Sequence, residues 1–139
     1  MEFGLSLGSN EGNTLANMRK ARIQLAAIDG VEVFASSCLY KTEPVDVPNE
    51  YSDRTFLNAV TLVYSHLDPG ALLKHVKAIE LALGRRRNEK TNLPRAIDID
   101  IIYADHKIHH EDDLDIPHPR WYQRRFVVQP LADVRPGMV

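Results

Sequence analysis

The sequence predicts an α+β fold, in which an open antiparallel sheet carries two helices on one face. Two observations support this prediction. Apolar residues alternate with a period of two, as in strands, in four separate segments, and they recur at helical spacing in two others. The six segments follow one another as strand, helix, strand, strand, helix, strand. This βαββαβ order favours a ferredoxin-like arrangement.

The first half of the chain provides three of these elements. Residues 2–8 alternate apolar with small or polar side chains and predict the first strand. Apolar residues at helical spacing over 13–27 predict a helix, and Gly30 is placed to end it. Residues 31–42 alternate again and predict one continuous strand, with Cys38 packed in its interior.

The second half of the chain provides the other three. Residues 55–65 predict a third strand after a long, proline-containing loop. Asp68 followed by proline is a typical helix start, and Gly84 marks the end of that helix. Residues 97–104 predict the fourth strand. A hairpin or short extra strands over 105–116 and a short helical tail over 121–134 complete the expected fold.

Length and composition set limits on the class of protein. A chain of 139 residues with 44% apolar and 26% charged residues is expected to form one domain over residues 1–139. The sequence contains neither a membrane-spanning apolar run nor a signal pattern, and its single cysteine cannot form an internal disulfide. These features predict a cytoplasmic protein that does not associate with membranes.

Two acids interrupt the apolar pattern of the fourth predicted strand. Because side chains alternate along a strand, Asp98 and Asp100 share one face, opposite to the isoleucines between and around them. Carboxylates about 6–7 Å apart repel one another, and a divalent cation such as Mg²⁺ between them would remove that repulsion. A solvated sheet face is the better explanation of an isolated Asp-x-Asp, so the neighbouring residues decide between the two.

Basic residues flank the acid pair in the sequence. Two basic groups, over 84–95 and 118–125, contain Arg85, Arg86, Arg87, Lys90, Arg95, Arg120, Arg124 and Arg125. A metal-binding acid pair beside guanidinium groups matches the charge of a polyphosphate. Taken alone, a run of arginines is usually solvated charge. Because the net charge is −2, two confined basic groups indicate a pocket for a small anion rather than a nucleic-acid surface.

Other residues suggest a pocket for a flat heterocycle. Asn58 shares a strand face with Phe56, so an amide could pair with the edge of a heterocycle while a ring stacks on its face. A core phenylalanine beside a satisfied polar side chain explains the pair equally well. Phe126 supplies either a second ring or ordinary packing of the tail. His118 lies between two prolines that stiffen its loop, which suits contact with a charged ligand, and a structural role is the alternative.

Seven short motifs occur together along the chain. They are Leu7-Gly8-Ser9-Asn10, Tyr40-Lys41-Thr42-Glu43-Pro44, Phe56-Leu57-Asn58-Ala59-Val60, Gly84-Arg85-Arg86-Arg87, Pro94-Arg95-Ala96-Ile97-Asp98-Ile99-Asp100-Ile101, Pro117-His118-Pro119-Arg120 and Arg125-Phe126-Val127-Val128-Gln129-Pro130-Leu131. With these motifs in this order, the chain resembles the 6-hydroxymethyl-7,8-dihydropterin pyrophosphokinase family of folate biosynthesis over nearly its whole length.

The resemblance implies a specific reaction. Members of the family transfer the β,γ-pyrophosphoryl unit of ATP to the hydroxymethyl group of 6-hydroxymethyl-7,8-dihydropterin and release AMP. Two Mg²⁺ ions would bind Asp98 and Asp100 and position the phosphates. The expected partners are therefore ATP and the pterin, without nucleic acid, and the protein is expected to be a monomer.

The resemblance also implies roles for individual residues. The catalytic contacts to the triphosphate are expected from Arg85, Arg95, His118 and Arg124. The pterin pocket is expected to be lined by Thr42, Pro44, Val45, Phe56, Asn58 and Phe126. The nucleotide is expected to contact Lys77, Glu80, Arg85, Ile101, His118 and Arg124. The family pattern is not followed at Lys77, Asn88 and Asn92.

Three other classes of protein are compatible with the predicted fold. An RNA-recognition domain would need a Gly-aromatic signature on its central strands, which the sequence lacks. A nucleotidyltransferase also pairs a Gly-Ser turn with Asp-x-Asp, but close together, whereas Gly8 and Asp98 are roughly ninety residues apart. A ligand-sensing regulatory domain would give the acid pair and the arginines no role.

Overall fold

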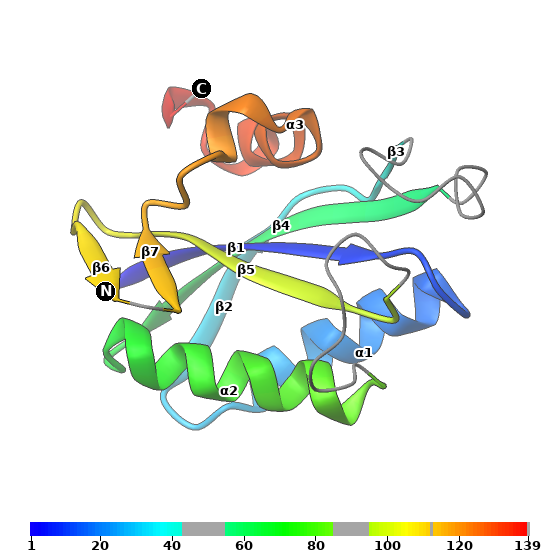
Figure 1. Cartoon of the computed structure of the whole chain (residues 1–139), viewed down its shortest axis with the longest axis horizontal. Helices are drawn as coiled ribbons and strands as arrows, with labels where there is room; N and C mark the ends of the chain where they lie inside the picture. Colours follow the sequence, from blue (N-terminus) through cyan, green and yellow to red (C-terminus); the bar gives the residue numbers. More distant parts are fainter. Residues whose placement is uncertain (43–54, 85–94, 112, 139) are drawn as a thin grey trace.

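The structure is a computed structural model that describes residues 1–42, 55–84, 95–111 and 113–138 (Figure 1). Its main elements are β1 (Glu2–Ser9), α1 (Thr14–Ala27), β2 (Val31–Ser36), β3 (Tyr40–Thr42), β4 (Phe56–Ser65), α2 (Pro69–Ala82), β5 (Asp98–Ala104), β6 (His109–Glu111), β7 (Leu114–Ile116) and α3 (Arg125–Val134). Short 3₁₀ helices at Trp121–Gln123 and Pro136–Met138 flank α3. The fold is therefore mixed α/β, as the sequence predicts, with an antiparallel sheet and three α-helices.

The main sheet has the strand order β2-β4-β1-β5, and all of its pairs are antiparallel. The short strand β3 also pairs with β4, next to β2 along the same edge, and β6 and β7 form a separate hairpin. β1 and β4 are thus interior strands with neighbours on both sides. Their apolar side chains are correspondingly buried over most of their length.

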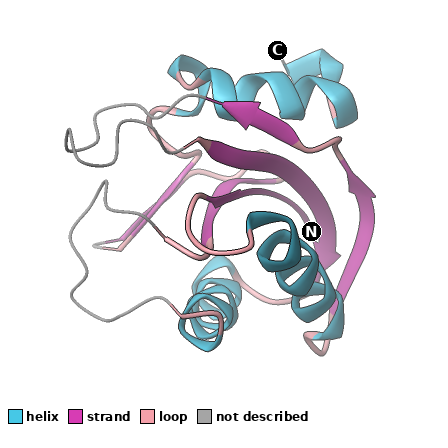
Figure 2. Cartoon of the chain, turned by 90° about the vertical axis from the view of Figure 1, so that its right-hand side faces the viewer, coloured by secondary structure: helices cyan, strands magenta, loops and turns pink. Residues whose placement is uncertain are grey.

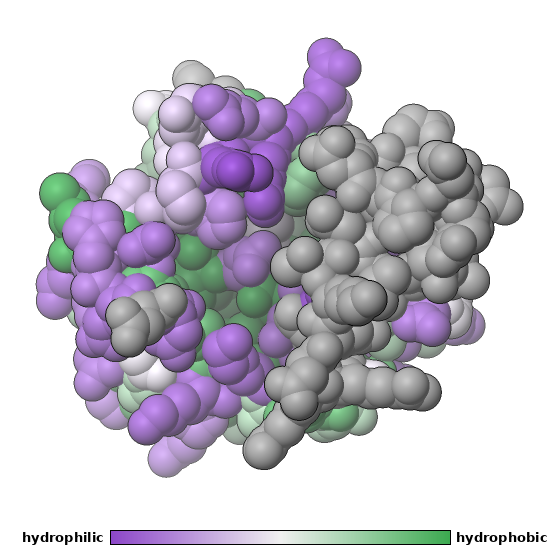
Figure 3. Space-filling view, viewed as in Figure 1, coloured by the Kyte–Doolittle hydropathy of each residue, from purple (hydrophilic) through white to green (hydrophobic). Residues whose placement is uncertain are grey.

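Helices cover both faces of the sheet (Figures 1 and 2). One face packs against α1 and α2 through a core that includes Phe3, Leu7, Met18, Leu25 and Val76. The other face packs against α3 through a second core, which contains Val60, Leu62, Ile102, Val127 and Leu131. Burying an aliphatic side chain of this size contributes roughly 1.5–3 kcal/mol, so both cores stabilise the sheet. On the face in Figure 3, hydrophobic residues show mainly in a recess below α3.

The predicted helix starts are confirmed in atomic detail. The Asn13 side chain accepts a hydrogen bond of 3.0 Å from the Ala16 amide at the start of α1. The Asp68 side chain accepts one of 2.8 Å from Ala71 at the start of α2, where proline occupies the first turn. Each acceptor satisfies an amide that has no partner within its helix. Gly84 adopts φ +113° beyond α2, a conformation that only glycine reaches without strain.

The prediction of one continuous strand over 31–42 is wrong. The chain leaves the strand at Ser37, whose hydroxyl accepts a hydrogen bond of 2.9 Å from the Val60 amide and donates one of 2.8 Å to the Cys38 carbonyl. A side chain therefore replaces part of the backbone ladder, and the segment divides into β2 and β3. Cys38 lies in this break and is exposed, so its predicted packing in a strand interior is also wrong.

The two elements expected after the fourth predicted strand are confirmed. The hairpin predicted over 105–116 corresponds to β6 and β7, and the helical tail predicted over 121–134 corresponds to a 3₁₀ turn followed by α3. Within the described ranges, no helix combines the length and the apolar character needed to cross a membrane.

Candidate active site

The candidate site lies where four strands meet at one end of the sheet. The register places Tyr40 opposite Asn58, Asn58 opposite Gly8, and Gly8 opposite Asp98. Residues paired across neighbouring strands project from the same face of a sheet. Residues from four segments that are far apart in the sequence therefore form one row on the α3 side of the sheet.

The carboxylate pair belongs to this row. Asp98 and Asp100 alternate with Ile97, Ile99 and Ile101, which are buried in the core on the side of α1 and α2. Alternation directs both acids to the opposite face, toward α3, where they are only partly buried. The predicted placement of the two carboxylates on one face is confirmed.

Gly8 lies between Asn58 and Asp98 in this row and has no Cβ atom. A Cβ atom at position 8 would lie 3.1 Å from Asn58 Oδ1 and 3.9 Å from Phe56 Cδ1. The β1 backbone at Gly8 therefore carries no side chain, and we call this surface the floor; the Asn58 amide and the Phe56 ring lie beside it. Such a surface suits a planar ligand that stacks on a ring and bonds to an amide.

Thr42 orients the Asn58 amide. Asn58 Nδ2 donates a hydrogen bond of 2.6 Å to Thr42 Oγ1, and Asn58 is 3% exposed. This bond satisfies one donor of the buried amide, and its Oδ1 lies beside Gly8, 3.1 Å from where a Cβ atom at that position would be. Asn58 is thus held by Thr42, with its Oδ1 beside the floor at Gly8.

His118 joins the site from the loop before α3. Its amide donates to the Ile102 carbonyl at 2.8 Å, which fastens the loop to β5. Burial and the nearby guanidinium of Arg124 lower the pKa of His118, and the Asp98 carboxylate opposes them only in part. The ring is therefore neutral at pH 7. Because the Arg120 amide donates to Nδ1 at 3.2 Å, the proton of the neutral ring is on Nε2.

Arg124 and Phe126 mark the start of α3. The Arg124 guanidinium carbon lies 5.6 Å from the centre of the Phe126 ring, within the range of a cation–π contact. Phe126 also packs beside the α3 core that contains Val60 and Ile102. It therefore lies on the same side of the sheet as Asn58 and the acid pair.

Arg95 is held just before β5. Its amide donates to Asn10 Oδ1 at 2.8 Å, and its carbonyl accepts from the Asn10 amide at 3.1 Å. The Arg95 side chain is 8% exposed. These two hydrogen bonds connect the residues before β5 to the residue after β1, and they fix the backbone position of Arg95.

Three of the residues predicted to contact a nucleotide lie on α2 or on the sheet face that packs against α1 and α2. Glu80 is buried at 4% exposure, and its Oε2 accepts a hydrogen bond of 2.8 Å from the Ile99 amide of β5. Ile101 is buried in the core beside α1 and α2, so only its backbone remains for a ligand. Lys77 is exposed on α2. The predicted positions Pro44, Val45 and Arg85 lie outside the described residues.

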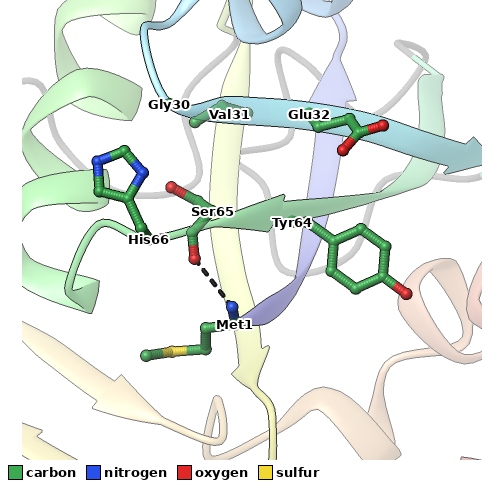
Figure 4. A pocket seen from close by; sticks show the side chains of 7 residues that line it. All are labelled: Met1, Gly30, Val31, Glu32, Tyr64, Ser65 and His66. Carbon is green, nitrogen blue, oxygen red and sulfur yellow. Dashed lines mark hydrogen bonds between the residues drawn. The ribbon is translucent and has the colours of Figure 1, made fainter.

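A shallow cavity lies at the other end of the sheet, and no predicted site residue lines it. Met1, Val31, Tyr64 and His66 are among the residues around it (Figure 4). Tyr64 pairs with Glu2, six residues before Gly8 on β1, which is roughly 20 Å away along the strand. The cavity is thus separate from the row that contains Asp98.

Sequence reasoning missed two contributions to the site. The sequence pattern assigns no role to Asn10, although its side chain anchors the backbone of Arg95. It places Gly8 at the end of a strand, although a Cβ atom there would crowd the Asn58 amide. The Leu7-Gly8-Ser9-Asn10 motif was the available signal for both residues.

The fold and the site define a small α/β protein in which paired carboxylates, a buried amide and the Arg124 guanidinium lie on the α3 side of the sheet. A model of the 7,8-dihydro-6-hydroxymethylpterin-pyrophosphokinase family matches residues 4–136. The chain belongs to this family.

Relatives with curated names agree with this assignment. The 2-amino-4-hydroxy-6-hydroxymethyldihydropteridine pyrophosphokinase of Methylorubrum extorquens is 38% identical, over 97% of this chain and 83% of its own. The enzyme of the same name from Bacillus subtilis is 36% identical, over 94% of this chain and 75% of its own. A folate synthesis bifunctional protein of Arabidopsis thaliana is 42% identical over 96% of this chain, which spans only 27% of that relative.

Solved structures show the same fold. The chain superimposes on an HPPK-DHPS crystal structure in complex with substrates with a TM-score of 0.69 at 17% identity, covering 97% of this chain and 40% of the other. The Plasmodium falciparum HPPK-DHPS with pteroate gives 0.65 at 16% identity, covering 95% of this chain and 38% of the other.

Proposed function

We propose that this chain transfers the pyrophosphoryl unit of ATP to the hydroxymethyl group of 6-hydroxymethyl-7,8-dihydropterin, a step of folate synthesis. Its family supports this reaction. The observation that carries the proposal is the row formed by Asn58, Gly8 and Asp98, which joins a surface for a flat heterocycle to a carboxylate pair. In this reaction the pterin hydroxyl oxygen attacks the β-phosphorus of ATP, the bond to the α–β bridging oxygen breaks, and AMP leaves.

The carboxylates of Asp98 and Asp100 suit a Mg²⁺ ion that is also bound by a nucleotide. Asp98 and Asp100 are partly exposed carboxylates on one face, and hard oxygen ligands suit this ion. Across the described ranges, no group of three or more His, Cys, Asp or Glu residues could hold a metal alone. Phosphate oxygens and water would therefore complete the coordination, and we propose two ions, as in the family. When bound, the metal supplies charge neutralisation for the phosphates.

Cationic and neutral donors would bind the triphosphate. Arg95 and Arg124, with Arg85 from outside the described residues, are proposed to balance the charge that accumulates on the departing α-phosphate. His118 would donate its Nε2 proton in a hydrogen bond to a phosphate oxygen. With Nδ1 accepting from the Arg120 amide, the neutral ring keeps a proton on Nε2 that it can donate.

The heterocycle would lie on the floor at Gly8. We propose that Phe56 stacks on one side of it and Phe126 on the other, while Asn58 bonds to its polar edge. The bond from Asn58 to Thr42 supports this orientation, because it leaves Oδ1 as the acceptor that faces the ligand. Pro44 and Val45 are proposed to line the same pocket, and Lys77, Glu80 and Ile101 are proposed nucleotide contacts.

The fold type, the domain organisation, the cellular location and the oligomeric state are further parts of this proposal. Two helices on one sheet face and the order β2-β4-β1-β5 support a ferredoxin-like arrangement with α3 added on the second face. One sheet shared by both cores supports a single catalytic domain over residues 1–139. We further propose that the protein acts in the cytoplasm as a monomer.

Identifying the nucleotide product tests the proposal. The protein is incubated with Mg·ATP and 6-hydroxymethyl-7,8-dihydropterin, and the nucleotides are separated by chromatography. We expect AMP, formed only when the pterin is present. Formation of ADP would indicate an ordinary kinase, and an absence of pterin-dependent turnover would contradict the proposal.

The same assay tests the acid pair. Asp98→Ala and Asp100→Ala should each lower kcat by at least about 10²-fold, while the far-UV circular dichroism spectrum stays unchanged. Near-normal rates in both variants would show that the carboxylates belong only to a solvated sheet face.

A further inference from the structure

Asp133 near the end of α3 joins this helix to β3. Its two carboxylate oxygens lie 2.8 and 2.7 Å from the Tyr40 hydroxyl, which donates to them. Its Oδ2 also accepts a longer bond of 3.4 Å from the Cys38 amide. The side chains belong to residues more than ninety positions apart in the sequence. Neither residue was among the predicted site residues.

The two joined elements carry opposite walls of the proposed pterin pocket. On β3, Tyr40 pairs with Asn58, and Thr42 two residues later accepts the bond from the Asn58 amide. On α3, Phe126 precedes Asp133 by seven residues, which is two helical turns and therefore the same side of the helix. The Tyr40–Asp133 pair thus links the strand that orients Asn58 to the helix face that carries Phe126.

β3 is a short strand at the edge of the described sheet. The strand has three residues, and β4 is its only strand neighbour within the described ranges. A short strand with a single neighbour contributes few hydrogen bonds of its own, so contacts with other elements decide its position. A charge-assisted bond to a helix that is itself packed on the core supplies such a contact.

We propose that Tyr40 and Asp133 form a positioning pair, which holds β3 and α3 at the spacing that a pterin ring needs between Asn58 and Phe126. The inference rests on the proposed function. Neither side chain touches the reacting atoms; the pair acts on the ligand through Thr42, Asn58 and Phe126. Without it, the two walls must be ordered when the pterin binds, and this cost lowers the affinity for the pterin but not for ATP.

Single and double variants test the pair. We expect Tyr40→Phe, which removes only the hydroxyl, and Asp133→Ala each to raise KM for the pterin about three- to tenfold. KM for ATP should stay within about twofold of the wild-type value. The double variant should resemble either single variant, because both remove the same contact. Asp133→Asn keeps an acceptor oxygen for the Tyr40 hydroxyl and should restore most of the pterin affinity.

A control separates positioning from general stability. Asp68→Ala removes the cap of α2, which begins near the end of the sheet away from the site, and should lower Tm without changing KM for the pterin. If Tyr40→Phe lowers Tm but leaves KM for the pterin unchanged, or raises KM for both substrates alike, the pair is merely structural and the inference is wrong.

Pterin binding is also measured directly by fluorescence, with a non-hydrolysable ATP analogue present. A wild-type protein that neither binds the pterin nor forms AMP would overturn the proposed function and the inference with it. A wild-type protein that binds the pterin, together with variants that bind it equally well, would overturn the inference alone.

Discussion

Gly8 is the residue on which the geometry of the site depends most directly. It lies between Asn58 and Asp98 in the cross-strand row, and its missing side chain leaves space above the backbone of β1. A methyl group there would lie 3.1 Å from Asn58 Oδ1, which is closer than an ordinary carbon–oxygen contact. Because Asn58 is buried and bonded to Thr42, it has little room to move away.

Gly8→Ala should therefore impair pterin binding more than folding. We expect KM for the pterin to rise at least about tenfold, because the methyl group both fills the floor and displaces the amide acceptor. Steady-state kinetics with each substrate varied in turn measures the effect. Gly137→Ala is the control, because a Cβ atom at that position has nothing within 4 Å and should leave both KM values unchanged. If Gly8→Ala and Gly137→Ala have the same KM for the pterin, the β1 backbone at Gly8 does not contact the pterin.

At the scale of the elements, α3 is held to the sheet by a polar cluster beyond its last turn. Arg135 donates bonds of 3.0 and 2.7 Å to the two carboxylate oxygens of Glu2 on β1, and the Tyr103 hydroxyl also donates to Glu2. The Arg135 guanidinium lies 5.6 Å from the Phe34 ring of β2. The cluster thus ties the end of α3 to three strands.

Glu2→Gln should destabilise the fold at neutral pH. The hydrogen bonds from Arg135 lower the pKa of Glu2, and burial opposes them only in part. We expect a loss of about 1–2 kcal/mol in the free energy of unfolding at pH 7, moderate because the Arg135 side chain is 38% exposed. Chemical denaturation measures it, with Glu32→Gln, an exposed glutamate of β2, as the matched control.

The sign of the pH dependence follows from the lowered pKa. A carboxylate that is more acidic in the folded state stabilises the protein fully above its unfolded pKa of about 4.5, and this contribution is lost as the pH falls through the folded pKa. The difference in the free energy of unfolding between the wild type and Glu2→Gln should therefore become smaller below pH 4.5. A difference that stays constant down to pH 3 would show that the charge of Glu2 is not what holds α3.

At the scale of the whole molecule, the cores that stabilise the fold are distinct from the residues proposed to bind metal. Buried aliphatic and aromatic side chains fill both sheet faces, whereas Asp98 and Asp100 remain partly exposed beside them. Folding should therefore not require a metal, because burial of apolar side chains rather than metal ligation stabilises both cores.

Removing divalent metal should abolish turnover and leave stability unchanged. With excess EDTA we expect no AMP, full recovery on adding Mg²⁺, and a Tm within about 1 °C of that of the untreated protein in the absence of ATP. Calorimetry and the nucleotide assay measure the two effects on one sample. A large drop in Tm with EDTA alone would mean that a metal is part of the fold.

The sequence by itself determined the type and order of most elements. Periodic apolar residues predicted the helices and most strands, caps such as Asp68 predicted helix starts, and alternation predicted that Asp98 and Asp100 share a face. Each of these features depends on residues within a few positions of one another, so local patterns were enough to predict them.

Only the tertiary structure decided how these elements meet. The register that aligns Asn58, Gly8 and Asp98, the second core under α3 and the contact between Tyr40 and Asp133 join residues from distant parts of the chain. The break at Ser37 likewise depends on Val60, far along the chain. Such contacts are selected by the packing of all elements together, which no local pattern specifies.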